Sequence, residues 1–425
     1  MSTGRGRGTG GTVGTPSTVR KSVNVLLCLA AVVAIGWCGR DLWQMVDGRR
    51  QIDAACAGLV PAGRVLSLSP AGGALTHRSS EEGTIDLDDG LPQDCEVFST
   101  EAGEAYGTRT GERWFFTGAV GVLPADGPRV ADHPMEVLLD PHGGPTHPYQ
   151  PLGGGITGIV TDSGVVVELP CAGGEADGRP VTALWARAEL MVTKPPFSEN
   201  GQLTDHDRDV LAETAVTTAN NLAGRLGCAD RLPDPPEDVP ALPEGPVPAS
   251  RAEGTCAWYR EAGFARSSRF PDQVLQSRTD DRLWDERCVL VLGPERAAGL
   301  YHAEVEDHSH LTRPTMPGQW FVSLHTYSGE RAKNVLLTSA HGDETPEPAE
   351  PGEAGRSSED PVWWASSVCA GQPQIHTMTL AHGYDKVISS EIEKAFRAYV
   401  TDVTERRHCT DVVLPKPSDF PFRPA

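Results

Sequence analysis

Histidines are the first residues in this chain whose type and spacing could do chemistry. His142 and His147 share one Gly- and Pro-rich stretch, and His302, His308 and His310 share a second, acidic one. Neither group has the H-E-x-x-H spacing that places two zinc ligands on one face of a helix. Such stretches more often carry solvated surface histidines. We therefore expect no metal site and no bound cofactor.

Other catalytic signatures are weaker still. The only phosphate-binding pattern is a formal G-x-G-x-x-G at 153–158, and a valine-rich, β-like run follows it where the fingerprint needs a helix. We interpret it as a turn. The sequence has no G-x-S-x-G elbow, S-x-x-K assembly or P-loop. Four tryptophans could line a ligand groove, but aromatic residues in strand-like runs are more often core: Trp114, Trp320, Trp363 and Trp364. No catalytic residue is predicted.

Cysteines carry the strongest pattern. Outside the N-terminal apolar segment they form two series of four, namely Cys56, Cys95, Cys171 and Cys228, then Cys256, Cys288, Cys369 and Cys409. None lies in the Cys-x-x-Cys pair typical of structural zinc. An even number at corresponding positions instead predicts disulfides, which persist outside the reducing cytoplasm. Because neighbours in sequence close the shorter loops, we expect bonds from first to second and from third to fourth cysteine in each series.

The surroundings of the cysteines also repeat. An aromatic run follows the second cysteine at 112–116 and again at 318–322, and each third cysteine opens Cys-Ala-Gly. Alternating, strand-like runs follow at 181–190 and 375–380. Recurrence of several landmarks in one order predicts an internal duplication.

A helix is expected to close each copy. Residues 205–226 carry an apolar stripe behind Thr204 as N-cap, and a second stripe follows Ser389 or Ser390. The stripe residues are Leu211, Ala215, Ala219, Leu222 and Leu226 in the first copy, and Ile392, Phe396, Tyr399 and Val403 in the second. Each copy is therefore expected to be α+β, a mostly antiparallel sheet with a long C-terminal helix.

These landmarks set the expected organisation outside the membrane. The first copy spans 44–231 and the second 251–414. Between them, 232–250 is rich in proline, which favours an extended, semi-rigid linker. Residues 415–425 remain as a tail.

The N-terminal segment predicts a membrane anchor. Residues 1–21 are almost devoid of apolar side chains and should form a disordered cytoplasmic tail. Residues 22–43 form the expected signal-anchor helix, because the uncharged part is long enough to span a bilayer and Arg20 and Lys21 flank its inner end. The alternative, a cleaved signal peptide, is disfavoured because Trp37 to Arg40 make a poor cleavage site. The bulk of the chain is then extracytoplasmic.

Composition limits the partners. Hydrophobic residues make up 39% and charged residues 22%, as in ordinary folded proteins, and the formal net charge is −21. Residues 44–425 hold 32 basic and 57 acidic residues, a net charge of −25. Such a surface repels phosphate backbones, so nucleic acid is not an expected partner.

The Cys-Ala-Gly openings, the closings at 227–230 and 408–411, the repeat and the Arg-rich, Lys-poor ectodomain resemble uncharacterised membrane-anchored proteins of actinobacteria, of the Streptomyces type. The resemblance covers most of 44–414. More loosely, the copies are similar to small two-disulfide extracytoplasmic domains of actinobacterial lipoproteins and kinase sensor regions. That resemblance implies a ligand- or partner-binding module, and it transfers no functional residue.

Two functions are weighed from the sequence. The first is a non-catalytic, membrane-anchored envelope module that binds a small molecule, a wall component or a protein partner. The alternative is an extracytoplasmic hydrolase with an unrecognised acid/histidine or metal site. The duplication repeats cysteines and core aromatics but no polar catalytic set, which favours the first.

Overall fold

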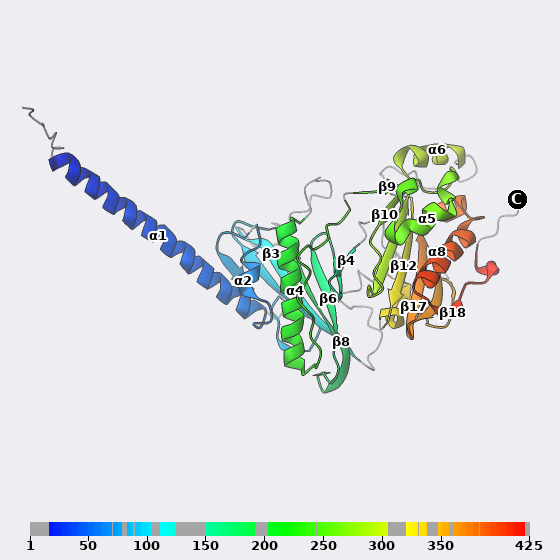
Figure 1. Cartoon of the computed structure of the whole chain (residues 1–425), viewed down its shortest axis with the longest axis horizontal. Helices are drawn as coiled ribbons and strands as arrows, with labels where there is room; N and C mark the ends of the chain where they lie inside the picture. The colour runs from blue at the N-terminus through cyan, green and yellow to red at the C-terminus, as the bar shows by residue number, and fades with distance from the viewer. Residues whose placement is uncertain are drawn as a thin grey trace, which may run out of the picture.

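The structure of the protein is a computed structural model, which describes residues 17–69, 71–78, 83–87, 90–103, 111–124, 149–191, 203–243, 245–304, 320–329, 331–337, 347–357, 361–381 and 383–420. The expected disordered tail falls largely outside these residues. The described chain is α+β, with two large antiparallel sheets and an N-terminal apolar helix (Figure 1). It holds four disulfides. The disulfides are Cys56–Cys95, Cys171–Cys228, Cys256–Cys288 and Cys369–Cys409, the pairs expected from the order of the cysteines.

The first sheet is built from residues 75–190. Its strand order is β1 (Leu75–His77), β2 (Gln93–Ser99), β3 (Arg113–Pro124), β8 (Arg179–Leu190), β6 (Gly164–Pro170), β5 (Ile156–Val160) and β4 (Gln150–Gly153), with β7 (Glu175–Ala176) pairing β8. Residues 153–155 all have positive φ and turn β4 into β5, so the G-x-G-x-x-G stretch is a hairpin turn.

The second sheet is built from residues 247–413. Its order is β15 (Gly355–Arg356), β16 (Val362–Cys369), β17 (Gln372–Leu380), β12 (Phe321–Ser328), β11 (Asp285–Val291), β10 (Gln273–Gln276) and β9 (Val247–Pro248), with β18 (Thr410–Val413) pairing β16. A separate small pair joins β13 (Leu336–Leu337) to β14 (Glu347–Pro348).

The helices are α1 (Ser17–Ala55), α2 (Ala62–Val65), α4 (Asp205–Leu226), α5 (Ala257–Ala262), α6 (Pro294–Glu304), α7 (Tyr384–Val387) and α8 (Ile392–Arg406). Short 3₁₀ turns lie at Ala249–Arg251, Gly254–Cys256, Phe264–Arg266, Arg331–Asn334 and Pro417–Asp419. In Figure 1, α4 crosses the strands of the first sheet and α8 lies beside β12 and β17.

Helix α1 projects from the rest of the chain as a single rod (Figure 1). Among the described residues it is the one helix long and apolar enough to cross a membrane. It does not stop at residue 43, where the span was expected to end. Ile52 and Ala55 are fully buried against the first sheet, and a Cβ on Gly48 would lie 3.2 Å from a Leu66 methyl carbon. The expected boundary at 43/44 therefore lies inside a continuous helix.

Helix α4 follows the expected pattern closely. The Thr204 hydroxyl accepts a hydrogen bond from the Asp207 N–H at 3.1 Å, and Gly227 ends the helix in the left-handed region at φ 78°. Leu211 and Leu222 of the stripe are fully buried in the core with β6 and β8.

The second core differs from expectation at both ends of α8. The N-cap is Glu391, not Ser389 or Ser390, because residues 389–391 form a turn that leads from α7 into α8. The stretch 415–420 is not a loose tail. Phe420 is buried and stacks on Trp363 at a ring-centroid distance of 5.8 Å, so apolar burial holds it to the second sheet.

The proline-rich linker is likewise packed. The side-chain oxygen of Asn220 on α4 accepts from the Leu232 N–H at 2.8 Å, and Val239 and Leu242 are buried. Val247 then pairs with β10 of the second sheet. The stretch 232–250, expected to be an extended spacer, lies along α4 and joins the second sheet.

Strand registers fix the position of the cysteines in the first sheet. Cys95 pairs with Gly118, Gly118 with Ala188, and Ala188 with Val165. Cys171 is the sixth residue after Val165 and directly follows β6.

The strand registers of the second sheet place its cysteines in the same way. Cys288 pairs with Leu324, Leu324 with Met378, and Met378 with Trp363. The sixth residue after Trp363 is Cys369. The second and third cysteines of the two series thus occupy equivalent positions on equivalently ordered strands.

The two sheets meet through the faces opposite α4 and α8, and we call this contact the inter-sheet seam. It is formed by Leu283 and Trp284 against Ala119, Ile159, Val166 and Trp185, with an Arg331–Glu168 ion pair at 3.0 Å. The Gln150 side chain also donates to the backbone carbonyl of residue 276 and accepts from the backbone N–H of residue 278. The seam therefore combines a small apolar cluster with several polar contacts.

Candidate functional site

A carboxylate, an imidazole and a hydroxyl form a hydrogen-bonded chain on the second sheet. His325 Nδ1 lies 2.9 Å from Asp285 Oδ1, and His325 Nε2 lies 3.1 Å from Ser323 Oγ. Ser323 and His325 are two residues apart on β12, so the strand period turns both to the same face. Asp285 begins the neighbouring strand β11. This is the order of groups found in serine hydrolases.

The three hydrogen-bonded side chains are buried away from solvent. Ser323, His325 and Asp285 are each at most 1% exposed. The ring of Tyr327 stacks on that of His325 at a centroid distance of 5.3 Å. Two buried oxygens beside the imidazole, Asp285 Oδ2 and Thr377 Oγ1, have no hydrogen-bond partner among the described residues. The arrangement has the groups for nucleophilic chemistry but no open path to them in this conformation.

A second buried histidine lies on the opposite face of the same sheet. His376 Nδ1 is 2.9 Å from the Thr326 hydroxyl, and His376 Nε2 is 2.9 Å from the Ser367 hydroxyl. Burial, together with the charge of Arg407, lowers the pKa of His376 to about 3. His376 is therefore neutral at physiological pH and joins strands β12, β16 and β17 as a hydrogen-bonding link.

The low pKa of His376 predicts acid lability. Between pH 6.5 and about 3 the unfolded chain binds a proton at this position that the folded chain does not, so stability falls as pH drops through this window. At pH 5 the loss is about 2 kcal/mol. Thermal melts at pH 7.5 and pH 5 should show it, and His376→Gln should reduce the difference. The control is His302→Gln, at an exposed position of helix α6. An equal acid shift in all three proteins would contradict the assignment.

Glu286 ties the end of α8 to the second sheet. Its fully buried carboxylate accepts from Arg407 at 2.7 Å and from Arg406 at 3.1 Å. Burial alone would raise the pKa of Glu286, but the two guanidinium groups outweigh it and hold the pKa below its usual value. The contact is structural, since both carboxylate oxygens are buried and accept from guanidinium groups.

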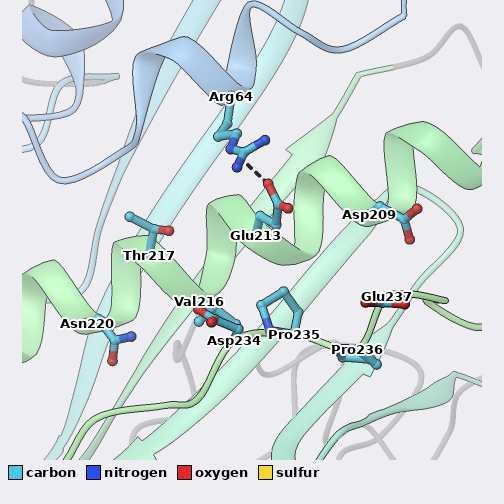
Figure 2. A pocket seen from close by; sticks show the side chains of 10 residues that line it. All are labelled: Arg64, Asp209, Glu213, Val216, Thr217, Asn220, Asp234, Pro235, Pro236 and Glu237. Carbon is cyan, nitrogen blue, oxygen red and sulfur yellow. Dashed lines mark ion pairs between the residues drawn. The ribbon is translucent and has the colours of Figure 1, made fainter.

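An accessible groove lies within residues 64–237 of the chain. Helix α4 and the proline-rich linker enclose a volume of about 570 Å³ (Figure 2). It is lined by Arg64, Asp209, Glu213, Val216, Thr217, Asn220, Asp234, Pro235, Pro236 and Glu237. Figure 2 shows Arg64 of α2 facing Glu213 of α4, with the two charged groups 2.8 Å apart.

The electrostatics of the groove favour positive charge. Four carboxylates face one guanidinium in its lining. Asp209 also accepts the Val239 N–H at 3.2 Å and so holds the linker in place, whereas Asp234 and Glu237 are exposed. The groove is within the size range of small-ligand sites.

No protein-family model, curated protein or solved structure matches this chain. The two candidate sites therefore rest on geometry.

The histidines and tryptophans considered as site residues from the sequence do not come together in one site among the described residues. His302 is exposed on α6, whereas His142, His147, His308 and His310 lie outside the described residues. In the described part of the chain, no group of three or more His, Cys, Asp or Glu residues is placed to hold a metal ion. Trp320, Trp363 and Trp364 are buried and Trp114 is half-buried, so all four tryptophans belong to packed regions rather than to an open groove.

Sequence reasoning missed both candidate sites. Ser323 and His325 gave one signal, since two polar residues with a period of two interrupt an apolar strand. Asp285 lies 40 residues earlier, and only the β11–β12 pairing brings it to His325. The groove was missed because its second wall is the proline-rich linker, which composition alone describes as a spacer.

Proposed function

We propose that this chain is a non-catalytic module of the cell envelope, anchored by one N-terminal helix with its N-terminus in the cytoplasm and its bulk outside. In this proposal it consists of two homologous, disulfide-stapled α+β domains, each closed by a long helix. It binds a small molecule, a wall component or a protein partner.

The duplication is supported by the strand registers. In each sheet, residue pairing across three neighbouring strand pairs, counted from the second cysteine, ends six residues before the third cysteine, Cys171 or Cys369. Helix α4 follows β8, and helix α8 follows β17 with the short helix α7 between them; β8 and β17 are both interior strands of their sheets. Agreement in strand order, register and disulfide position together supports an internal duplication.

The location is supported by covalent chemistry. Four disulfides suit an oxidising compartment, and α1 is long and apolar enough to cross a bilayer. The Cys56–Cys95 bond follows directly on the buried end of α1. The span and the first sheet are thus joined without a flexible spacer.

One observation carries the binding role. The α4 groove is open and lined by polar and charged side chains, while the groups suited to catalysis are buried. With four carboxylates and one guanidinium, the groove suits a positively charged ligand such as an amino-bearing wall peptide.

The groove predicts charge-dependent binding. Asp234→Asn with Glu237→Gln removes two exposed carboxylates without touching the Arg64–Glu213 pair, and should weaken binding of a tetralysine peptide about fivefold. Isothermal titration of the full-length protein in nanodiscs measures this. The matched control is Glu295→Gln with Glu405→Gln, two exposed acids outside the groove. Equal affinity in both double variants, or preference for the fully acetylated peptide, would contradict the proposal.

The second candidate is an extracytoplasmic hydrolase. A single observation favours it, the Asp285–His325–Ser323 chain. The complete burial of the Ser323 hydroxyl ranks it behind the binding role in the conformation described.

A further inference from the structure

We propose that Ser323, His325 and Asp285 form a latent acyl-transfer site, which acts on carboxylic esters when the inter-sheet seam opens. This inference rests on the second candidate function and assigns its residues, its gate and its substrate class.

The first sheet provides an internal control. Counting from the paired cysteines, Thr117 occupies the position equivalent to Ser323, Ala119 that of His325, and Pro92 that of Asp285. The same strand arrangement therefore forms without the acid and the imidazole. Since the fold does not require the Asp285–His325–Ser323 hydrogen bonds, their presence in the second sheet needs another explanation.

The second buried histidine provides another control. Ser367 and His376 also make a serine–histidine contact, at 2.9 Å, but the third partner is the Thr326 hydroxyl instead of a carboxylate. A hydroxyl does not stabilise an imidazolium as a carboxylate does. Only the Ser323 chain has the group that fixes the tautomer and supports the charge.

The reaction follows from the order of the three groups. The Asp285 carboxylate accepts the Nδ1–H of His325 and leaves Nε2 free to take the Ser323 proton. The Ser323 oxygen bonds to the ester carbonyl carbon, and the alcohol leaves with the proton returned from Nε2. Water then attacks the acyl-serine, giving its proton to His325, and Ser323 recovers a proton as the acid departs. Asp285 is a positioning residue, while Ser323 and His325 meet the substrate.

The seam borders the site and is suited to act as its gate. Trp284 of the seam directly precedes Asp285, and Tyr327, which stacks on His325, packs in one cluster with Ala332, the neighbour of Arg331. Ser323 and His325 lie on the sheet face opposite the α8 core, because the alternating residues Val322 and Leu324 pack into that core. Leaving Asp285 Oδ2 and Thr377 Oγ1 buried without partners costs free energy that hydration would return. The apolar part of the seam is small, and the Arg331–Glu168 ion pair supports it.

The test uses the full-length chain in nanodiscs and a fluorescent fluorophosphonate, whose fluoride is displaced by the serine oxygen and leaves as hydrogen fluoride. Glu168→Ala loosens the seam from the first sheet and leaves all three groups in place. Leu283→Ala is the second loosening variant. Hydrogen exchange of β12 reports opening, and peptide mapping locates the label.

We expect Ser323 to be labelled at least tenfold faster in Glu168→Ala than in the unmodified chain. Adding Ser323→Ala should abolish the label, adding His325→Ala should slow it about 100-fold, and adding Ser367→Ala should leave it unchanged. Asp285→Asn should alter the pH profile of labelling between pH 6 and 9 without shifting the thermal midpoint equally.

Two results would overturn the proposal. One is a label that maps away from Ser323 or survives Ser323→Ala. The other is the absence of label in both loosening variants. If hydrogen exchange of β12 rises without labelling, Ser323 is not a nucleophile. If the exchange stays unchanged, the seam is not the gate. Peptide binding in the groove should be indifferent to Ser323→Ala, so this inference and the binding role fail independently.

Discussion

Replacing Glu286 with alanine is expected to destabilise the second core by about 3–5 kcal/mol. The carboxylate is fully buried and is shared by Arg406 and Arg407, of which the Arg407 side chain is only 3% exposed. Removing it leaves a guanidinium charge in a site with little water. The cost exceeds that of a typical surface substitution because the penalty is the desolvation of the orphaned charge.

Urea titration of the full-length protein in detergent, followed by tryptophan fluorescence, measures this effect. Trp363 reports on the second core because it lies in its interior. Glu405→Ala is the matched control, since Glu405 is on the same helix, next to Arg406, but exposed. If Glu286→Ala and Glu405→Ala shift the transition equally, the buried ion pairs do not hold α8 in place.

Local signals made much of the fold predictable. The stripe at 205–226 and its Thr204 cap are encoded within one helix, and the structure reproduces both. The four disulfides follow from cysteine order, because each bond closes a loop between neighbours in sequence. The apolar N-terminal segment is a composition signal and needs no tertiary information.

The features that sequence reasoning missed all depend on long-range packing. Asp285 reaches His325 only through strand pairing, and the linker becomes a groove wall only because Leu232 and Val239 bind α4. The stretch 415–420 is held by Phe420 stacked on Trp363 and by hydrogen bonds that Trp363 and Arg397 donate to its backbone, contacts that composition does not reveal. Such contacts are set by the whole core, so a pattern read along the chain does not contain them.

In the function proposed here, α1 spans the membrane and holds the disulfide-bonded bulk of the chain outside the cytoplasm. Protease added to intact, wall-stripped cells tests it most directly, with a cytoplasmic protein as the control that must stay whole. Because the four disulfides of the described residues all lie beyond α1, we predict that nearly the whole chain is digested and that only a fragment containing α1 remains. Full protection of the chain in cells whose cytoplasmic control is also intact would rule out this topology.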